Sequence, residues 1–129
     1  MTEFIIGALL IFSIWIAVYV LLKNRTKKLS KEQYNKAITS INNTKKLNPA
    51  HAILESHKIF VKTLQTLAKK KTNAAKIIQT LSKKIPNEKD IWKYHGIRNK
   101  IAHETDFMVS AKQADKARKV FVRGLSKFH

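Results

Sequence analysis

The chain opens with a continuous apolar run, and segments with helical spacing follow it. Residues 4–22 are nineteen residues without a charge, and Ser13 is their only strongly polar member. An α-helix of this length extends roughly 28 Å, close to the ~30 Å hydrocarbon thickness of a bilayer. The run therefore predicts a transmembrane helix. The Met-Thr-Glu start and the lack of an Ala-x-Ala site favour a retained anchor over a cleaved signal peptide.

Basic residues directly after the apolar run predict its orientation. They are Lys23, Arg25, Lys27, Lys28 and Lys31, whereas Glu3 is the only charged side chain before the run. Because positively charged flanks remain on the cytoplasmic side, we expect a single pass through the inner cell membrane with the C-terminal part in the cytoplasm. The residues expected near anionic headgroups are Lys23, Arg25, Lys27 and Lys28.

Beyond this basic flank, apolar positions recur at helical spacing, and no strand-like alternation of useful length appears. Ser30-x-x-Gln33 is a capping box, which predicts a helix over about 31–44. Asn48 and Pro49 supply an N-cap and a first-turn proline for a second helix. The apolar stripe of that helix comprises Ile53, His57, Phe60, Leu64 and Leu67. On such a stripe, a histidine is expected to be a hydrogen-bonded core or interface residue.

Three further helices are predicted. The first of them is expected to begin at Thr72 or Asn73 and to end at Pro86, and its apolar residues up to Ile85 are expected to face inward. Asn87 is expected to cap the next. A second capping box, Ser110-x-x-Gln113, precedes a final amphipathic helix whose apolar positions are Ala114, Ala117, Phe121, Leu125 and Phe128.

Short connections between these helices favour antiparallel neighbours. We therefore expect an all-α fold, in which a transmembrane helix is followed by an antiparallel up-down bundle of four to five helices. The expected division of the chain is a transmembrane anchor over 1–23, a basic juxtamembrane segment with the first amphipathic helix over 24–47, and a helical bundle over 48–129.

Composition narrows the classes of function. The 129 residues include three Gly, two Pro and no Cys, which argues against a disulfide-stapled or zinc-clamped fold. No Gly-rich phosphate loop, Ser-His-Asp order or paired carboxylates at active-site spacing appear, and we expect no metal and no cofactor. The formal charge of +18 would attract phosphate polyanions or anionic lipid. A lysine-rich solvated surface without such a partner is an equal alternative.

The candidate chemistry lies in the stretch from Trp92 to Glu104. It places Arg98 and His103 five residues apart in a helix-compatible segment. A guanidinium can hold a phosphate bidentately without losing its charge, and an imidazole can exchange protons near neutral pH. This pair could therefore serve phosphate chemistry.

The segment from residue 48 to the C-terminus resembles the HEPN superfamily, the "higher eukaryotes and prokaryotes nucleotide-binding" domains, which are helical bundles. The motif Arg98-Asn99-Lys100-Ile101-Ala102-His103 matches the family's arginine, polar residue and later histidine. Trp92 and His95 precede it, and Glu104 and Asp106-Phe107-x-x-Ser110 follow. The similarity also reaches Ala52-Ile53-Leu54-Glu55-x-x-Lys58, so it covers about 80 residues. The whole arrangement is similar to small bacterial proteins with an N-terminal anchor before a HEPN-like bundle.

The resemblance implies a metal-independent endoribonuclease, or a catalytically silent relative that binds RNA, a nucleotide or a protein. Active members form a composite site where two bundles dimerise, so we expect a homodimer. Arg98 would hold the scissile phosphate. His103 would act as general base or acid, and attack by the RNA's own 2′-hydroxyl would leave a cyclic phosphate. The supporting or RNA-binding residues would be Asn99, His95, Glu104 and Lys100.

Two positions depart from the family pattern. Toxin members carry a Tyr two positions after the histidine, whereas this chain has Thr105, so control by modification of that tyrosine is not expected. Val61 stands where the most similar family members have an acidic residue.

Helical geometry limits how the motif can work. A five-residue offset leaves Arg98 and His103 roughly 140° apart around an ideal helix. His103 must therefore lie at a helix end or bend, or a second copy must complete the pair. His95, Asn99 and His103 step by four and would form a polar ridge. In a purely structural alternative, Arg98 and Asn99 serve capping and Glu104 pairs with Arg98. A structural dimerisation module is a third alternative.

Overall fold

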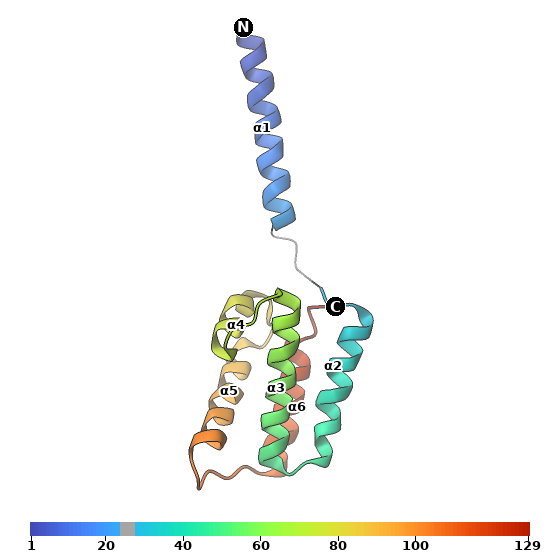
Figure 1. Cartoon of the computed structure of the whole chain (residues 1–129), viewed down its shortest axis with the longest axis vertical. Helices are drawn as coiled ribbons and strands as arrows, with labels where there is room; N and C mark the ends of the chain where they lie inside the picture. The colour runs from blue at the N-terminus through green and yellow to red at the C-terminus, as the bar shows by residue number, and fades with distance from the viewer. Residues whose placement is uncertain (24–27) are drawn as a thin grey trace.

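The structure is a computed structural model that describes residues 1–23 and 28–129. The described residues form six α-helices and no strand (Figure 1). The helices are α1 (Thr2–Lys23), α2 (Lys31–Asn43), α3 (Pro49–Ala68), α4 (Ala74–Leu81), α5 (Glu88–His103) and α6 (Ala111–Gly124), with 3-10 turns η1 (Thr44–Lys46) and η2 (Ser82–Lys84). The headgroup contacts expected of Arg25 and Lys27 lie outside the described residues.

α1 is the one described helix that is long and apolar enough to cross a membrane. None of its 22 residues is buried, and Figure 1 shows it extending away from the other helices. The hydroxyl of Ser13 donates to the carbonyl oxygen of Leu10 at 2.8 Å, so the polar side chain within the apolar run is satisfied inside the helix. Such a large exposed apolar surface is typical of a membrane or interaction segment.

Side-chain caps begin four of the helices where the sequence predicts them. In both capping boxes, the serine hydroxyl accepts from the backbone N–H three residues later, and the glutamine side chain accepts from the serine N–H. At α3, the side-chain oxygen of Asn48 accepts from the N–H of His51 at 2.9 Å, and Pro49 occupies the first turn. Asn73 caps α4 through the N–H of Lys76. These predictions are confirmed, since each cap satisfies an N–H that the helix leaves free.

Two predicted helix ends and one predicted cap are wrong. α5 begins directly after Asn87, but the side chain of Asn87 makes no cap hydrogen bond to it; its amide nitrogen instead donates to the carbonyl oxygen of Val120 in α6 at 2.9 Å. The third predicted helix ends at Leu81, and η2 then brings Ile85 into the core. The final helix ends at Gly124, and a turn buries both Leu125 and Phe128. The apolar residues of both segments face inward as expected. However, their last members are buried by turns that follow the helices, not by the helices themselves.

α3 forms the centre of the bundle, because it packs against α2, α4, α5 and α6. Phe60 of α3 and Phe121 of α6 are fully buried, with ring centroids 5.3 Å apart. Gly124 permits this close packing, because a Cβ there would lie 2.9 Å from both Phe60 and Ile91. Ala37 and Ile41 of α2 are buried too. α2 therefore shares the core, whose buried apolar residues come from every helix of the bundle.

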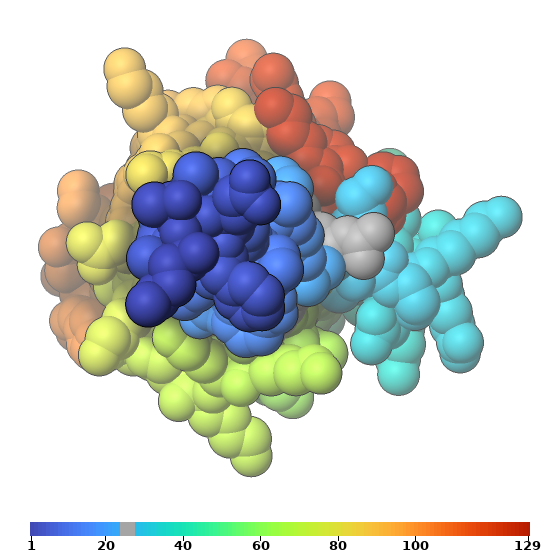
Figure 2. Space-filling view, turned by 90° about the horizontal axis from the view of Figure 1, so that it is seen from above, coloured from blue at the N-terminus to red at the C-terminus, as the bar shows by residue number. Residues whose placement is uncertain are grey.

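The C-terminal residues pack beside the start of α2, as Figure 2 shows where red and cyan atoms meet. The N–H of Leu29 donates to the carbonyl oxygen of Phe128. The rings of Tyr34 and His129 stack with centroids 3.8 Å apart. These contacts join the two ends of the bundle.

Candidate functional site

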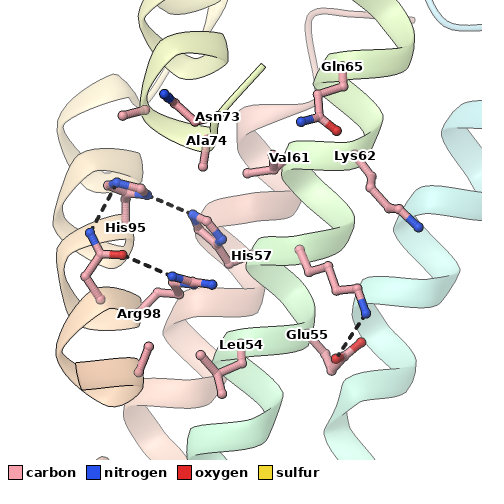
Figure 3. Close-up of a pocket in the computed structure, with 14 residues that line it drawn as sticks. Leu54, Glu55, His57, Val61, Lys62, Gln65, Asn73, Ala74, His95 and Arg98 are labelled. Carbon is pink, nitrogen blue, oxygen red and sulfur yellow. Dashed lines mark hydrogen bonds and ion pairs between the residues drawn. The ribbon is translucent and has the colours of Figure 1, made fainter. Parts of the chain in front are cut away.

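A cleft of about 750 Å³ lies between α3, the beginning of α4 and α5 (Figure 3). Small-molecule sites typically have volumes of roughly 300–1,000 Å³. Its charged and polar lining residues are Glu55, His57, Lys58, Lys62 and Gln65 from α3, Asn73 before α4, and His95, Arg98 and Asn99 from α5. The apolar lining residues are Leu54, Val61, Ala74, Ala75 and Ala102. The cleft thus combines cationic side chains with an apolar wall.

Helical spacing explains why these side chains meet. On α5, His95 and Asn99 lie one turn apart on the same side of the helix. On α3, His57 belongs to the buried stripe and is only 3% exposed. Because α3 and α5 pack against each other, His57 faces His95 across the helix interface.

A chain of hydrogen bonds crosses the floor of the cleft. Nη1 of Arg98 donates to the side-chain oxygen of Asn99 at 3.2 Å. The amide nitrogen of Asn99 lies 3.4 Å from Nε2 of His95. Nδ1 of His95 lies 2.9 Å from Nε2 of His57. Figure 3 shows these contacts as dashed lines running from Arg98 to His57.

The directions of these bonds assign a tautomer to each neutral histidine ring. A guanidinium can only donate, so the oxygen of Asn99 must face Arg98 and its NH₂ group must face His95. Nε2 of His95 therefore accepts, which leaves the proton of the neutral ring on Nδ1. That Nδ1–H donates to Nε2 of His57, so His57 is also neutral and carries its proton on Nδ1. The tautomer of each ring is thus assigned from the hydrogen bonds that the ring makes.

The electrostatic environment favours the same protonation states. The pKa of His57 is lowered from 6.5 to about 3, first by burial and then by the neighbouring charges of His95 and Arg98. Burial and the charge of Arg98 also lower the pKa of His95. Both rings are therefore uncharged at neutral pH, and Arg98 is the fixed cation of the floor of the cleft.

Arg98 has no carboxylate partner among residues 1–23 and 28–129. The ion pairs there join Lys58 to Glu55 at 3.8 Å and Arg118 to Asp115. Glu104, the partner in the structural alternative, is exposed and directly follows α5. The guanidinium is half-buried, and Glu55, the acidic residue of the cleft lining, pairs with Lys58 rather than with Arg98. The charge of Arg98 is therefore not neutralised, which is favourable for binding an anion.

The structure brings Arg98, Asn99 and His95 together but places the other predicted site residues elsewhere. His103 is the last residue of α5 and is exposed, and it does not line the cleft. The geometric requirement that it lie at a helix end is met. Lys100 is exposed, with Nζ 5.7 Å from the centroid of the Phe107 ring. Of the three residues of the expected ridge, only His95 and Asn99 therefore lie together in the described part of the chain.

His57 is the member of the site that its sequence pattern did not reveal. Its place on the apolar stripe predicted a hydrogen-bonded core or interface histidine, and its burial agrees with that. Its partner is 38 residues away in the sequence, so only the packing of α3 on α5 reveals the contact. The described residues contain no group of three His, Cys, Asp or Glu side chains that could hold a metal ion.

No protein-family model, curated protein or solved structure matches this chain. The motif and the cleft are therefore the basis for assigning a function. Together they define a half-buried guanidinium in a basic cleft, and a histidine five residues further along the same helix.

Proposed function

We propose that this protein is a membrane-tethered, HEPN-like domain with an antiparallel up-down bundle, and that it cleaves RNA without a metal ion. Arg98 would hold the scissile phosphate and the charge that develops on it. His103 would transfer a proton to or from the reacting oxygens. Attack by the 2′-hydroxyl would give a cyclic phosphate end.

The state of Arg98 is the observation that carries this proposal. Its guanidinium lines a cleft of about 750 Å³ and pairs with no carboxylate of the described residues. Its bond to Asn99, at 3.2 Å, leaves its other N–H groups for a ligand. Lys62 and the beginning of α4 add favourable charge for a phosphodiester at the rim.

The position of His103 supports a site shared by two copies. It lies on a different side of α5 from Arg98, because an offset of five residues turns the side chain by roughly 140°. Its exposure at the helix end makes it available to a second molecule. Under two-fold symmetry, each copy could supply His103 to the Arg98 cleft of the other.

We further propose that α1 anchors the protein in the inner membrane by a single pass, with the bundle in the cytoplasm. The length and apolar composition of α1 support the anchor. The basic residues after it support the orientation, since Lys23 and Lys28 would meet anionic headgroups.

A cleavage assay tests the proposal. Full-length protein in detergent is incubated with labelled single-stranded RNA in the presence of a metal chelator, and the product ends are analysed. We expect cyclic phosphate ends, and we expect Arg98→Ala and His103→Ala to lower the rate by about 10²-fold or more. Arg123→Ala and His51→Ala are matched controls, because both residues are exposed and lie outside the cleft. Equal cleavage by all four variants would reject the proposal.

A non-catalytic binding module is the second candidate, and one observation favours it. The cleft that holds Arg98 contains no contribution from His103 within one copy of the chain. In this case the cleft would hold RNA, a nucleotide or a partner protein, with no product formed. Salt-sensitive binding of RNA without cleavage would identify this function.

A further inference from the structure

His95 is held very differently at its two ring nitrogens. Nδ1 lies 2.9 Å from the deeply buried His57, whereas Nε2 lies 3.4 Å from Asn99. The second contact is near the limit of a hydrogen bond. Trp92 contacts the same ring edge-to-face, with centroids 5.6 Å apart. The His95 ring is therefore held firmly through Nδ1 on its buried side, whereas the contact of Nε2 with Asn99 is weak.

A ligand at Arg98 would release this loosely held nitrogen. Arg98 holds the oxygen of Asn99, and this bond orients the amide towards His95. A phosphate that engages the guanidinium bidentately would compete with Asn99 for its N–H groups. Once Asn99 turns away, Nε2 of His95 presents a free lone pair, while Nδ1–H remains bound to His57.

We infer that His95 is a catalytic base of this site, taking the proton from the 2′-hydroxyl of RNA bound at Arg98, and that His57 is its positioning residue. The inference rests on the proposed function, because it assigns a further role within the same RNA-cleaving site. It gives the site a base in the same cleft as Arg98, which His103 of that copy does not supply.

Cleavage of one phosphodiester forms one bond to phosphorus and breaks another. The 2′-oxygen bonds to phosphorus as its proton passes to Nε2 of His95. The bond between phosphorus and the 5′-oxygen breaks, and that oxygen takes a proton from protonated His103 of the second copy. The products are a 2′,3′-cyclic phosphate and a 5′-hydroxyl, and both imidazoles regain their starting states by exchange with water.

The surroundings of His95 are compatible with this role. His57 accepts from Nδ1–H both before and after the transfer, as the orienting member of a catalytic triad does. The positive charge that forms on His95 would be repelled by Arg98, and the bound phosphate offsets that repulsion. The other titratable groups that line the cleft are Glu55, Lys58 and Lys62 from α3, and Glu55 is paired with Lys58.

Isosteric variants of the full-length protein in detergent test this inference with the same labelled RNA and chelator. In His95→Asn, the amide nitrogen can replace Nδ1 as donor to His57 but cannot act as a base. We expect its cleavage rate to fall by about 10²-fold or more, with the affinity for RNA kept within about threefold of wild type. Equal cleavage by His95→Asn and wild type would overturn the inference.

Two variants of His57 separate positioning from packing. His57→Gln keeps an acceptor for His95, and His57→Leu keeps the apolar contacts without one. We expect the rate of the Leu variant to fall by about tenfold and that of the Gln variant to stay within about threefold of wild type. The opposite order would overturn the positioning role.

A pH profile gives the answer even if His95→Asn fails to fold. A base must be unprotonated, so the rate should fall about tenfold per pH unit on the acid side, and the acid limb belongs to His95. His103→Asn, measured at its residual rate, should keep this acid limb. Loss of the acid limb in His103→Asn would overturn the inference.

A wild-type protein that cleaves no RNA would reject the proposed function and this inference together, whereas cleavage that is indifferent to His95 rejects this inference alone.

Discussion

The buried histidine of α3 should make the stability of the bundle depend on pH. His57 is 3% exposed, and its pKa is lowered from 6.5 to about 3, mainly by burial. In the range between these values the unfolded chain binds a proton that the folded chain does not. The free energy of unfolding must therefore decrease as the pH falls through this range. The informative change is His57→Gln, which keeps an acceptor for His95 but cannot titrate.

The size of the effect follows from the two pKa values. From pH 7 to about pH 5, protonation of the unfolded imidazole stabilises the unfolded state by about 2 kcal/mol, while the folded imidazole stays neutral. Both pH values lie above the folded pKa, so the unfolded pKa dominates the result. The wild type should thus lose about 2 kcal/mol more unfolding free energy than His57→Gln over this interval.

Urea unfolding of the full-length protein in a non-ionic detergent, followed by circular dichroism, measures this difference. His51→Gln is the matched control, because this exposed histidine of α3 stays hydrated in both states. The control should keep the pH dependence of the wild type. If His57→Gln loses as much stability as the wild type between the two pH values, His57 is not a buried neutral histidine and the derived hydrogen-bond chain is wrong.

Three further predictions concern packing, capping and charge. Gly124→Ala should lower the unfolding free energy by about 1–3 kcal/mol, because its Cβ would press on Phe60 and Ile91 at 2.9 Å. Gly96→Ala, with nothing within 4 Å of its Cβ, should raise the unfolding free energy by about 0.5–1 kcal/mol; thermal melts compare the pair, and the same sign for both would contradict the packing. Ser110→Ala should cost about 1 kcal/mol in urea unfolding through loss of the cap of α6, and an unchanged midpoint would contradict it. RNA binding measured by fluorescence anisotropy should weaken linearly with log salt, and loss of one phosphate contact in Arg98→Ala should reduce the slope by about 0.7; an unaltered slope would place Arg98 away from the RNA.

Local signals predict the fold wherever one side chain decides a boundary. The capping boxes at Ser30 and Ser110 act within four residues, so their effect can be read from the sequence. Asn87 has the same capping chemistry, but α6 offers its amide a carbonyl oxygen from Val120, 33 residues away. The apolar character of Phe128 likewise predicts its burial, but the turn that places it in the core depends on packing against the start of α2.

In the candidate site too, some contacts can be predicted from the sequence and others depend on the packing of the helices. The spacing of four predicted that His95 and Asn99 would share a side of α5, and a hydrogen-bonding contact joins them. The same spacing grouped His103 with them, yet the helix ends at that residue and the cleft does not reach it. His57 and His95 meet because α3 packs on α5. Periodicity assigns each of them to a side of its own helix, but it does not specify which helix lies opposite.

Mixing two inactive variants tests the proposed shared site most directly. Arg98→Ala and His103→Ala are each expected to cleave RNA at least about 10²-fold more slowly than wild type. If each site takes Arg98 from one copy and His103 from the other, equal mixing and exchange of subunits creates one intact site in each mixed dimer. Half of the dimers are then mixed, so cleavage should return to about one quarter of the wild-type rate. A mixture that exchanges subunits and stays as inactive as its components would contradict the shared site.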